Sequence, residues 1–202
     1  MTVENTFIAA VKSRRTYYSI GKNSPVSDER IREVIGEMVC SVPSAFNSQS
    51  ARAVVLFGEA HKKVWGITLE TLRKLVPAGA FGKTEEKIGT FAAGHGTVLY
   101  FDDTPVTNAL MEQFPAYRDN FPVWAQQANG MLQFAVWTAL EQEGLGVSLQ
   151  HYNPLIDEEV KKTFGLPETW KLIAEMPFGE PTGTPAKKTI LPVEKRMLAF
   201  DK

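Results

Sequence analysis

The longest regular pattern of apolar and polar positions lies between Phe121 and Pro154. Its main apolar stripe recurs at i, i+4, i+7 and i+8, as on one helix face, and consists of Trp124, Ala128, Met131, Leu132, Ala135, Val136, Ala139 and Leu140. Three more apolar residues lie outside this stripe: Ala125, Phe134 and Trp137. Because a helix that is apolar on two faces is normally packed on both, the pattern predicts a central helix. It should end near Gly144, where a left-handed residue is expected.

Shorter patterns predict the other elements. Helical spacing and N-cap residues indicate helices at 2–12, 27–40, 59–75, 83–93, 105–114 and 158–164, with caps at Thr2, Ser27 and Asp157. Runs of β-branched and aromatic residues indicate strands at 52–58, 96–102, 146–150 and 170–178. Strands separated by helices predict a layered α/β or α+β domain, and no internal repeat or linker divides residues 1–202.

Composition narrows the class of protein. With 44% hydrophobic and 22% charged residues, the chain has enough apolar surface for a substantial core. Its formal net charge of −1 gives no general affinity for polyanions, so nucleic acid is not an expected partner. Its apolar runs are too short to span a membrane. The single cysteine, Cys40, excludes an internal disulfide, so we expect a soluble, cytoplasmic protein.

Several familiar site motifs are missing. The sequence has no Gly-x-Gly-x-x-Gly after a strand, no Walker phosphate loop and no Gly-x-Ser-x-Gly elbow. Its three histidines, His61, His95 and His151, are far apart and lack the spacing of metal ligands. The pair Asp102-Asp103 has no accompanying His or Glu cluster. We therefore expect neither a metal site nor a Rossmann dinucleotide site.

Two polar stretches are candidate ligand sites. Arg14, Arg15 and Thr16 follow the first predicted helix and suit a phosphate or carboxylate, because guanidinium groups present a rigid fork of donors. Arginines at this position also commonly complement the helix dipole. The loop from Ser44 to Gln49 offers uncharged donors and acceptors that suit a flat heteroaromatic ring, although a locally capped turn explains them equally well.

These stretches together resemble the nitroreductase family of flavin mononucleotide (FMN) enzymes. The matching segments are Arg14 to Tyr18, Pro43 to Gln49, and Gly144-Leu145-Gly146 leading into Leu149-Gln150-His151, with basic residues Lys187 and Lys188 near the C-terminus. The run from Leu149 to Pro154 is similar to that of a branch of small fungal and bacterial nitroreductase-like proteins. The resemblance covers essentially the whole chain.

The resemblance implies an α+β fold with a central mixed or antiparallel sheet between helices. It also implies a homodimer in which the long central helix lies at the interface. Each of two FMN sites would then be built from both chains. Residues 1–202 would form one FMN-binding domain, and an arm from about 190 to 202 would pack on the partner subunit.

The resemblance also assigns roles by position. Arg14, Arg15 and Thr16 would contact the FMN phosphate and ribityl region, together with Lys187 and Lys188. The other chain would contribute residues toward the ribityl chain and the pyrimidine edge: Ser44, Asn47 and Gln49. One side of the ring would be flanked by Leu149, Gln150 and His151, and the pocket wall would include Tyr17, Tyr18 and Phe46.

The sequence departs from the family pattern in two places. His151-Tyr152 stands where many members have an acidic residue and a glycine. Lys188-Thr189-Ile190 replaces a Lys-x-Arg pattern. The region between Leu75 and Gly96 does not align well, so contacts of Lys83 or Lys87 with the flavin stay open.

The implied activity is reduction of nitroaromatics or quinones by NAD(P)H, in ping-pong order through flavin N5. The cofactor carries this redox chemistry, so no protein acid or base is required. His151 is a candidate proton donor because histidine titrates near neutrality, and a structural hydrogen bond is the alternative. A second interpretation is a flavin-binding regulatory or stress-response protein with incidental reductase activity.

Overall fold

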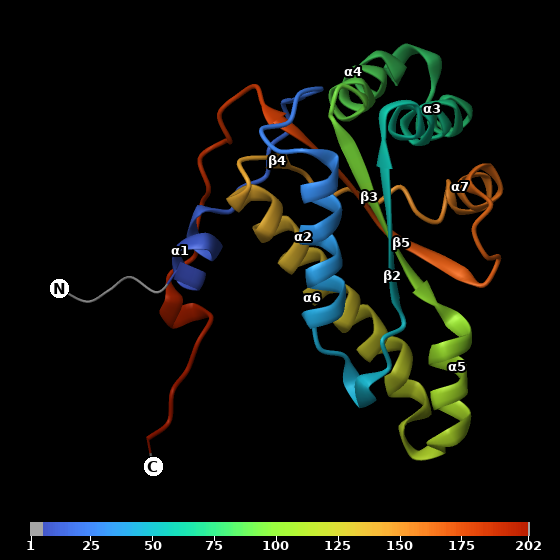
Figure 1. The fold of residues 1–202 in the computed structure, drawn as a ribbon, viewed down its shortest axis with the longest axis vertical. Helices are drawn as coiled ribbons and strands as arrows, with labels where there is room; N and C mark the ends of the chain where they lie inside the picture. Colours follow the sequence, from blue (N-terminus) through green and yellow to red (C-terminus); the bar gives the residue numbers. More distant parts are fainter. Residues whose placement is uncertain (1–5, 202) are drawn as a thin grey trace.

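The computed structural model describes residues 6–201 and places helices on both faces of an antiparallel sheet (Figure 1). The helices are α1 (Thr6–Ser13), α2 (Asp28–Ser41), α3 (Gly58–Leu75), α4 (Phe81–Ala92), α5 (Thr104–Gln113), α6 (Phe121–Gln142) and α7 (Asp157–Phe164). The strands are β1 (Ile20–Gly21), β2 (Ala51–Phe57), β3 (Gly96–Asp103), β4 (Gly146–Val147) and β5 (Trp170–Pro181). Short 3₁₀ turns are η1 (Ala45–Asn47), η2 (Ala78–Ala80), η3 (Pro115–Asn120) and η4 (Val193–Lys195).

The sheet has the order β1-β5-β3-β2, with β4 also paired to β5, and every one of these pairings is antiparallel. β3 and β5 form its centre, where Leu99 lies opposite Glu175 and Tyr100 opposite Ala174. The register then shifts, so that Phe101 pairs with Leu172 and Ile173 bulges out. This arrangement confirms the α+β class predicted from the sequence.

Two apolar cores lie on opposite faces of the sheet. The first is formed by α2, α6 and one set of strand residues, among them Val98, Tyr100 and Met176. The second is formed by α3, α4, α7 and the alternate strand residues, among them Leu99 and Phe101. Alternation of side chains along β3 explains why its eight residues are almost entirely buried, since both faces are covered.

The long helix α6 begins at Phe121, as expected, but its buried face differs from the predicted stripe. Ala125, which was assigned to the second face, is buried together with Ala128, Leu132, Val136 and Leu140 of the predicted stripe, whereas Met131 of that stripe is 44% exposed. The predicted stripe therefore combined positions from a buried face and from an exposed face. Met131, Phe134 and their neighbours form a second apolar face of the chain.

Polar side chains interrupt the buried face of α6. Gln133 Nε2 donates to Asn129 Oδ1 at 2.7 Å, and Asn129 Nδ2 donates to the carbonyl oxygen of Phe101 at 3.0 Å. These hydrogen bonds tie the helix to β3 and satisfy groups that burial would otherwise penalise. Within residues 6–201, no helix has both the length and the apolar character needed to cross a membrane.

The boundaries of several elements differ from the predictions. The strand expected at 146–150 ends at Val147, although Gln150 still forms an isolated bridge with Glu175. The short strand β1 was not predicted, because two residues give no periodic signal. Ser27 caps α2 as predicted, accepting a hydrogen bond from Arg30 N, whereas the predicted cap at Thr2 lies outside the described residues.

Asp157 does not cap α7, contrary to the prediction. It is the first residue of the helix, and no side-chain cap is formed at Ile156. The carboxyl group of Asp157 instead accepts a hydrogen bond from the backbone of Leu172 on β5. The helix therefore begins with its acidic side chain directed at the sheet.

Candidate functional site

A cationic cavity lies where the chain leaves α1. It has a volume of about 250 Å³ and is lined by Arg14, Arg15, Thr16, Tyr18, Ala186 and Lys188. Three of its six lining side chains are positively charged, and none is acidic. The cavity therefore joins two sequence segments that the resemblance assigned to one phosphate group. Lys187 is exposed and does not line it.

Arg14 is held in a defined orientation at this cavity. Its guanidinium carbon lies 4.3 Å from the ring centroid of Trp137 on α6, in a cation–π contact. Its Nη1 is buried and has no acceptor within the described chain. Buried donors are normally paired, so this orphaned N–H group fits an anionic ligand better than the helix-dipole role.

Arg15 is held by its backbone and its side chain. Its backbone N–H donates to Glu141 Oε2 at 2.8 Å, and its Nη2 donates to the carbonyl oxygen of Ala186. The other carboxylate oxygen of Glu141 accepts the indole N–H of Trp137 at 2.7 Å. Glu141 thus connects the backbone of Arg15 with the ring on which Arg14 stacks.

The pKa of Glu141 is raised by burial, which disfavours the charged form. Its two N–H donors and the positive charges of Arg14 and Arg15 oppose that shift. Sequence reasoning missed Glu141 and placed Trp137 only on an apolar face. The available signal was a Trp and a Glu at i, i+4 near the end of an otherwise uncharged helix.

The end of the cavity connects directly to β4. Thr16 forms an isolated parallel bridge with Val147, and the Tyr17 backbone N–H donates to the Val147 carbonyl at 2.9 Å. Tyr17 and Tyr18 also line a neighbouring cavity of about 160 Å³. Leu149 is two residues beyond Val147, so it lies within about 7 Å of this bridge along an extended chain.

The Gln150–Tyr152 segment is fixed to β5 through one residue, Glu175. Gln150 and Glu175 exchange two backbone hydrogen bonds, at 2.7 and 3.0 Å. The backbone N–H of Tyr152 donates to Glu175 Oε2 at 2.8 Å. Leu149 is partly buried against the first core and His151 is exposed, so the segment presents His151 to solvent.

The third predicted segment, from Ser44 to Gln49, forms a tight loop. Ser44 Oγ accepts the backbone N–H of Gln49 at 2.9 Å. Phe46, Asn47 and Gln49 all have left-handed backbone angles, with φ of 56°, 50° and 51°. Such angles are uncommon outside glycine and cluster at functional sites. The exposed Phe46 ring stacks 5.9 Å from that of Trp124 on α6.

The structure does not bring all the predicted site residues together in one chain. Phe46 contacts Phe121 and Trp124 at the start of α6, whereas Arg14 and Arg15 contact Trp137 and Glu141 near its end. Figure 1 shows α1 near the opposite end of α6 from the loop that joins α2 to β2. Twenty helical residues separate Phe121 from Glu141, a distance of about 30 Å. The Ser44–Gln49 loop therefore cannot reach the cationic cavity of its own chain.

Other polar residues singled out in the sequence have structural partners. Asp103 Oδ2 pairs with Arg52 Nη2 at 2.6 Å, and Asp102 accepts from the Thr107 hydroxyl at 3.2 Å. His61 is buried and its Nδ1 lies 2.8 Å from Thr97 Oγ1, while burial lowers the pKa of His61 to about 4. His95 Nε2 lies 2.7 Å from Asp28 Oδ1.

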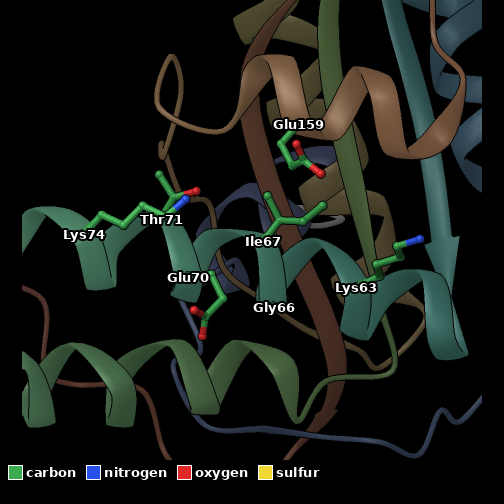
Figure 2. A pocket seen from close by; sticks show the side chains of 7 residues that line it. All are labelled: Lys63, Gly66, Ile67, Glu70, Thr71, Lys74 and Glu159. Atoms are coloured by element: carbon green, nitrogen blue, oxygen red, sulfur yellow. The ribbon is translucent and has the colours of Figure 1, made fainter.

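Another cavity lies away from this site. It measures about 540 Å³ and lies between α3 and α7. Figure 2 shows Lys63, Glu70 and Lys74 along α3 and Glu159 on α7, above Ile67. Charges of both signs alternate around this open groove, and it shares no lining residue with the cationic cavity. It has no arrangement of groups that selects a ligand.

Comparison with known proteins places this geometry in a family. Residues 11–180 match the nitroreductase family. The Saccharomyces cerevisiae protein HBN1 is 36% identical over 193 residues, covering 95% of this chain and 96% of that protein. The nitroreductase FRM2 of the same yeast is 32% identical, with the same coverage.

Solved structures show the same similarity. The nitroreductase CinD from Lactococcus lactis, in complex with chloramphenicol, superposes with a TM-score of 0.89 at 41% identity, covering 96% of this chain and all of that one. A nitroreductase from Desulfitobacterium hafniense with bound FMN shares the fold, with a TM-score of 0.72 at 18% identity, covering 98% of this chain and all of that one. The family match and the well-covered relatives lead to one conclusion: this chain belongs to the nitroreductase family of oxidoreductases.

Proposed function

We propose that this protein is an FMN-dependent reductase that passes electrons from NAD(P)H to nitroaromatic or quinone acceptors. The observation that carries the proposal is the cationic cavity with its buried, unpaired Arg14 Nη1. A dianionic phosphate supplies the acceptors that this donor set lacks. The FMN-bound fold relative supports the choice of a flavin. FMN, when bound, supplies the two-electron chemistry.

Different residues of one chain bind different parts of FMN. Arg14, Arg15 and Lys188 hold the phosphate, with Lys187 adding positive charge nearby and Thr16 reaching the ribityl region. Leu149, Gln150 and His151 flank one side of the ring. Backbone hydrogen bonds between Gln150 and Glu175 fix this segment to β5. The bridge between Val147 and Thr16 fixes its position relative to the phosphate end of the site.

We propose that the rest of the site comes from a second copy of the chain. Ser44, Asn47 and Gln49 lie at the far end of α6 from the cationic cavity, so an isologous dimer with antiparallel α6 helices brings them to the partner's cavity. The second apolar face of α6 fits that interface. It contributes to a groove of about 330 Å³ lined by Phe7, Met38, Val42, Pro43, Met131, Phe134, Ala135, Thr138 and Ala139.

The C-terminal arm fits the same assembly. From 190 to 201 the chain is exposed and contains only the short turn η4, yet it carries large apolar side chains such as Ile190, Leu198 and Phe200. Phe200 is 85% exposed in the single chain. We propose that this arm packs on the partner subunit. One FMN-binding domain spanning 1–202 and a cytoplasmic location complete the proposal.

The proposed class of electron acceptor rests on the aromatic side chains near the site and on the ligands of one relative, CinD. CinD has been solved with chloramphenicol, nicotinic acid and 4-nitrophenol, so that protein accepts flat aromatic molecules. In this chain, Phe46 of the Ser44–Gln49 loop, Tyr117 and Trp124 form an aromatic group in which Phe46 and Tyr117 are exposed and Trp124 is partly buried. In the proposed dimer this group faces the partner's ring flank, where it can stack on a planar acceptor.

An anaerobic titration tests the activity. The purified protein, supplied with FMN, is mixed with NADH or NADPH while the flavin absorbance is followed. We expect bleaching by a reduced nicotinamide and recovery on adding 4-nitrophenol or a quinone. Bound flavin that neither nucleotide reduces would favour the regulatory or stress-response interpretation, and a protein that stays colourless after FMN is supplied would exclude both.

A charge placed in the groove tests the dimer. Met131→Glu is expected to shift sedimentation toward the monomer and to weaken FMN binding, because each site loses its partner loop. Leu75→Glu, an equally drastic change at an exposed position on α3, is the matched control and should do neither. A wild-type monomer that retains FMN at low concentration would exclude the shared site.

A further inference from the structure

A cluster of buried oxygen atoms lies behind the Gln150–Asn153 segment, on the sheet face that carries Leu99. Within residues 6–201, three of these atoms have no hydrogen-bond donor: Glu175 Oε1, Asp157 Oδ1 and Asn153 Oδ1. Glu175 is 0% exposed. Ionised carboxylates and amide oxygens can only accept hydrogen bonds, so these three atoms are acceptors without a donor.

The main influences on the pKa of Glu175 are burial, backbone N–H groups and the charge of Asp157, and none of these is a positive charge. The residue opposite Glu175 on β3 is the apolar Leu99, and α3 contributes Trp65, whose ring meets that of Tyr152 edge to face. The titratable groups that act on Glu175 are Asp157 from α7 and Tyr152 from the loop. The negative charge of Asp157 disfavours a second charge on Glu175.

The nearby lysines act on Asp157. Burial raises the pKa of Asp157 and Glu158 raises it further, whereas Lys161 and Lys171 lower it. Lys161 Nζ is itself engaged by Glu158 at 2.9 Å and by Glu168 at 3.3 Å. A proton on Glu175 supplies the missing donor, because a protonated carboxyl group presents one O–H.

The same residue holds the chain that flanks the proposed ring site. The backbone of Glu175 makes two hydrogen bonds to the backbone of Gln150, and its Oε2 accepts the backbone N–H of Tyr152. These three bonds surround His151, the exposed residue between them. A reorganisation of the Glu175 carboxyl group therefore acts on the backbone at Tyr152, directly after His151.

We propose that Glu175 is a positioning residue for the cofactor: its protonated carboxyl group donates through Oε1 to Asp157 or Asn153 and holds the Gln150–Tyr152 segment against the flavin ring. This inference rests on the proposed FMN site. Burial, assisted by Asp157, raises the pKa of Glu175 to about 8. The donor is then present at neutral pH and lost under mildly alkaline conditions.

Glu175→Gln tests the inference, because its amide keeps an oxygen for the Tyr152 N–H and a donor for Asp157 or Asn153 at every pH. The FMN dissociation constant is measured between pH 7 and 9 by quenching of flavin fluorescence. We expect the wild-type constant to rise at least fivefold and that of Glu175→Gln to change less than twofold. Glu180→Gln, at the exposed end of the same strand, should follow the wild type.

Infrared spectra of the same proteins without FMN provide a second measurement. The wild type at pH 7 should show the carbonyl stretch of a protonated carboxyl group, which weakens by pH 9 and is missing from Glu175→Gln. Asp157→Asn is a second variant, whose amide can donate to an ionised Glu175 and should move the pH dependence below 7.

Three results would overturn the inference. They are a flat wild-type binding profile, a Glu175→Gln profile that still rises like the wild type, or no infrared difference between the two proteins at pH 7. Failure of the proposed function can be distinguished from failure of this inference. A wild type that binds no FMN at any pH removes the positioning role along with the cofactor, and the infrared band still decides the protonation of Glu175.

Discussion

Two buried carboxyl groups hold the main chain on either side of the proposed FMN site, and they differ in their neighbours. Glu141 accepts the Arg15 backbone N–H with one oxygen and the Trp137 indole N–H with the other. Glu175 accepts the Tyr152 backbone N–H with one oxygen, and its other oxygen has no donor within residues 6–201. Burial raises the pKa of both.

The difference shows that burial alone does not decide the charge of a carboxyl group. Glu141 lies beside Arg14 and Arg15, whose charges favour its ionised form. The nearest charge acting on Glu175 is another acid, Asp157. The sign of the nearby charges therefore separates an ionised carboxylate at the phosphate end of the site from a neutral acid at the ring end.

Removing the arginine at the phosphate end should have the largest effect. Arg14→Ala is expected to weaken FMN binding by about 1.5–3 kcal/mol, the range for a charge-assisted contact, which corresponds to roughly 10- to 150-fold in the dissociation constant. Equilibrium binding of FMN measures the change. Arg32→Ala is the control, because Arg32 also stacks on an aromatic ring, at 4.9 Å from Phe57, but lies outside the cavity. Equal affinities for Arg14→Ala and the wild type would remove the proposed phosphate contact.

Glu175, at the ring end of the proposed site, should make the stability of the protein fall as pH rises. Glu175 has a pKa of about 8 in the folded protein against an ordinary value of 4.5, so the folded state binds more protons between these values. From pH 6.5 to 8 this costs about 1–2 kcal/mol of unfolding free energy. His61, whose folded pKa is about 4 against 6.5, opposes this loss by roughly a few tenths of a kcal/mol in the window, because half of the unfolded histidine is already neutral at pH 6.5.

Urea unfolding at pH 6.5 and 8 measures this loss. Glu175→Gln should abolish the part due to Glu175 and leave the variant at least as stable as the wild type at pH 8. The control Glu180→Gln should keep the loss. An identical pH dependence in the wild type and Glu175→Gln would show that Glu175 is ionised throughout and would remove the contrast with Glu141.

The Glu→Gln substitution at the phosphate end, Glu141→Gln, should change the unfolding free energy in the opposite direction from Glu175→Gln. Glu141→Gln leaves one amide oxygen for two N–H donors, so either the Arg15 backbone N–H loses its acceptor or Trp137 Nε1 keeps only its longer bond, at 3.3 Å, to the Arg15 carbonyl oxygen. We expect a loss of about 1 kcal/mol in unfolding free energy at pH 8, whereas Glu175→Gln is neutral or stabilising there. Unfolding of both variants under one condition makes the comparison, and a shared sign would contradict it.

Local signals in the sequence predicted much of the fold. The run of β-branched and aromatic residues at 96–102 and the capped apolar pattern after Ser27 both produced the expected elements, because their periodicity and caps act within a few residues. Arg14, Arg15 and Lys188 were also named from the sequence, and the structure brings them to one cavity. That part depended on family resemblance, since the two segments are about 170 positions apart in the sequence.

Tertiary structure decided what local patterns could not. Which positions of α6 are buried within one chain depends on the sheet beneath it: Ala125 is buried, whereas Met131 is exposed. The sequence predicted that Asp157 caps a helix, but in the structure its carboxyl group interacts with the backbone of Leu172 on β5. Glu175 lies in a strand whose sequence gives no sign of special chemistry. Its role follows from long-range neighbours, because a charge is set by donors and fields in space and not by adjacent residues.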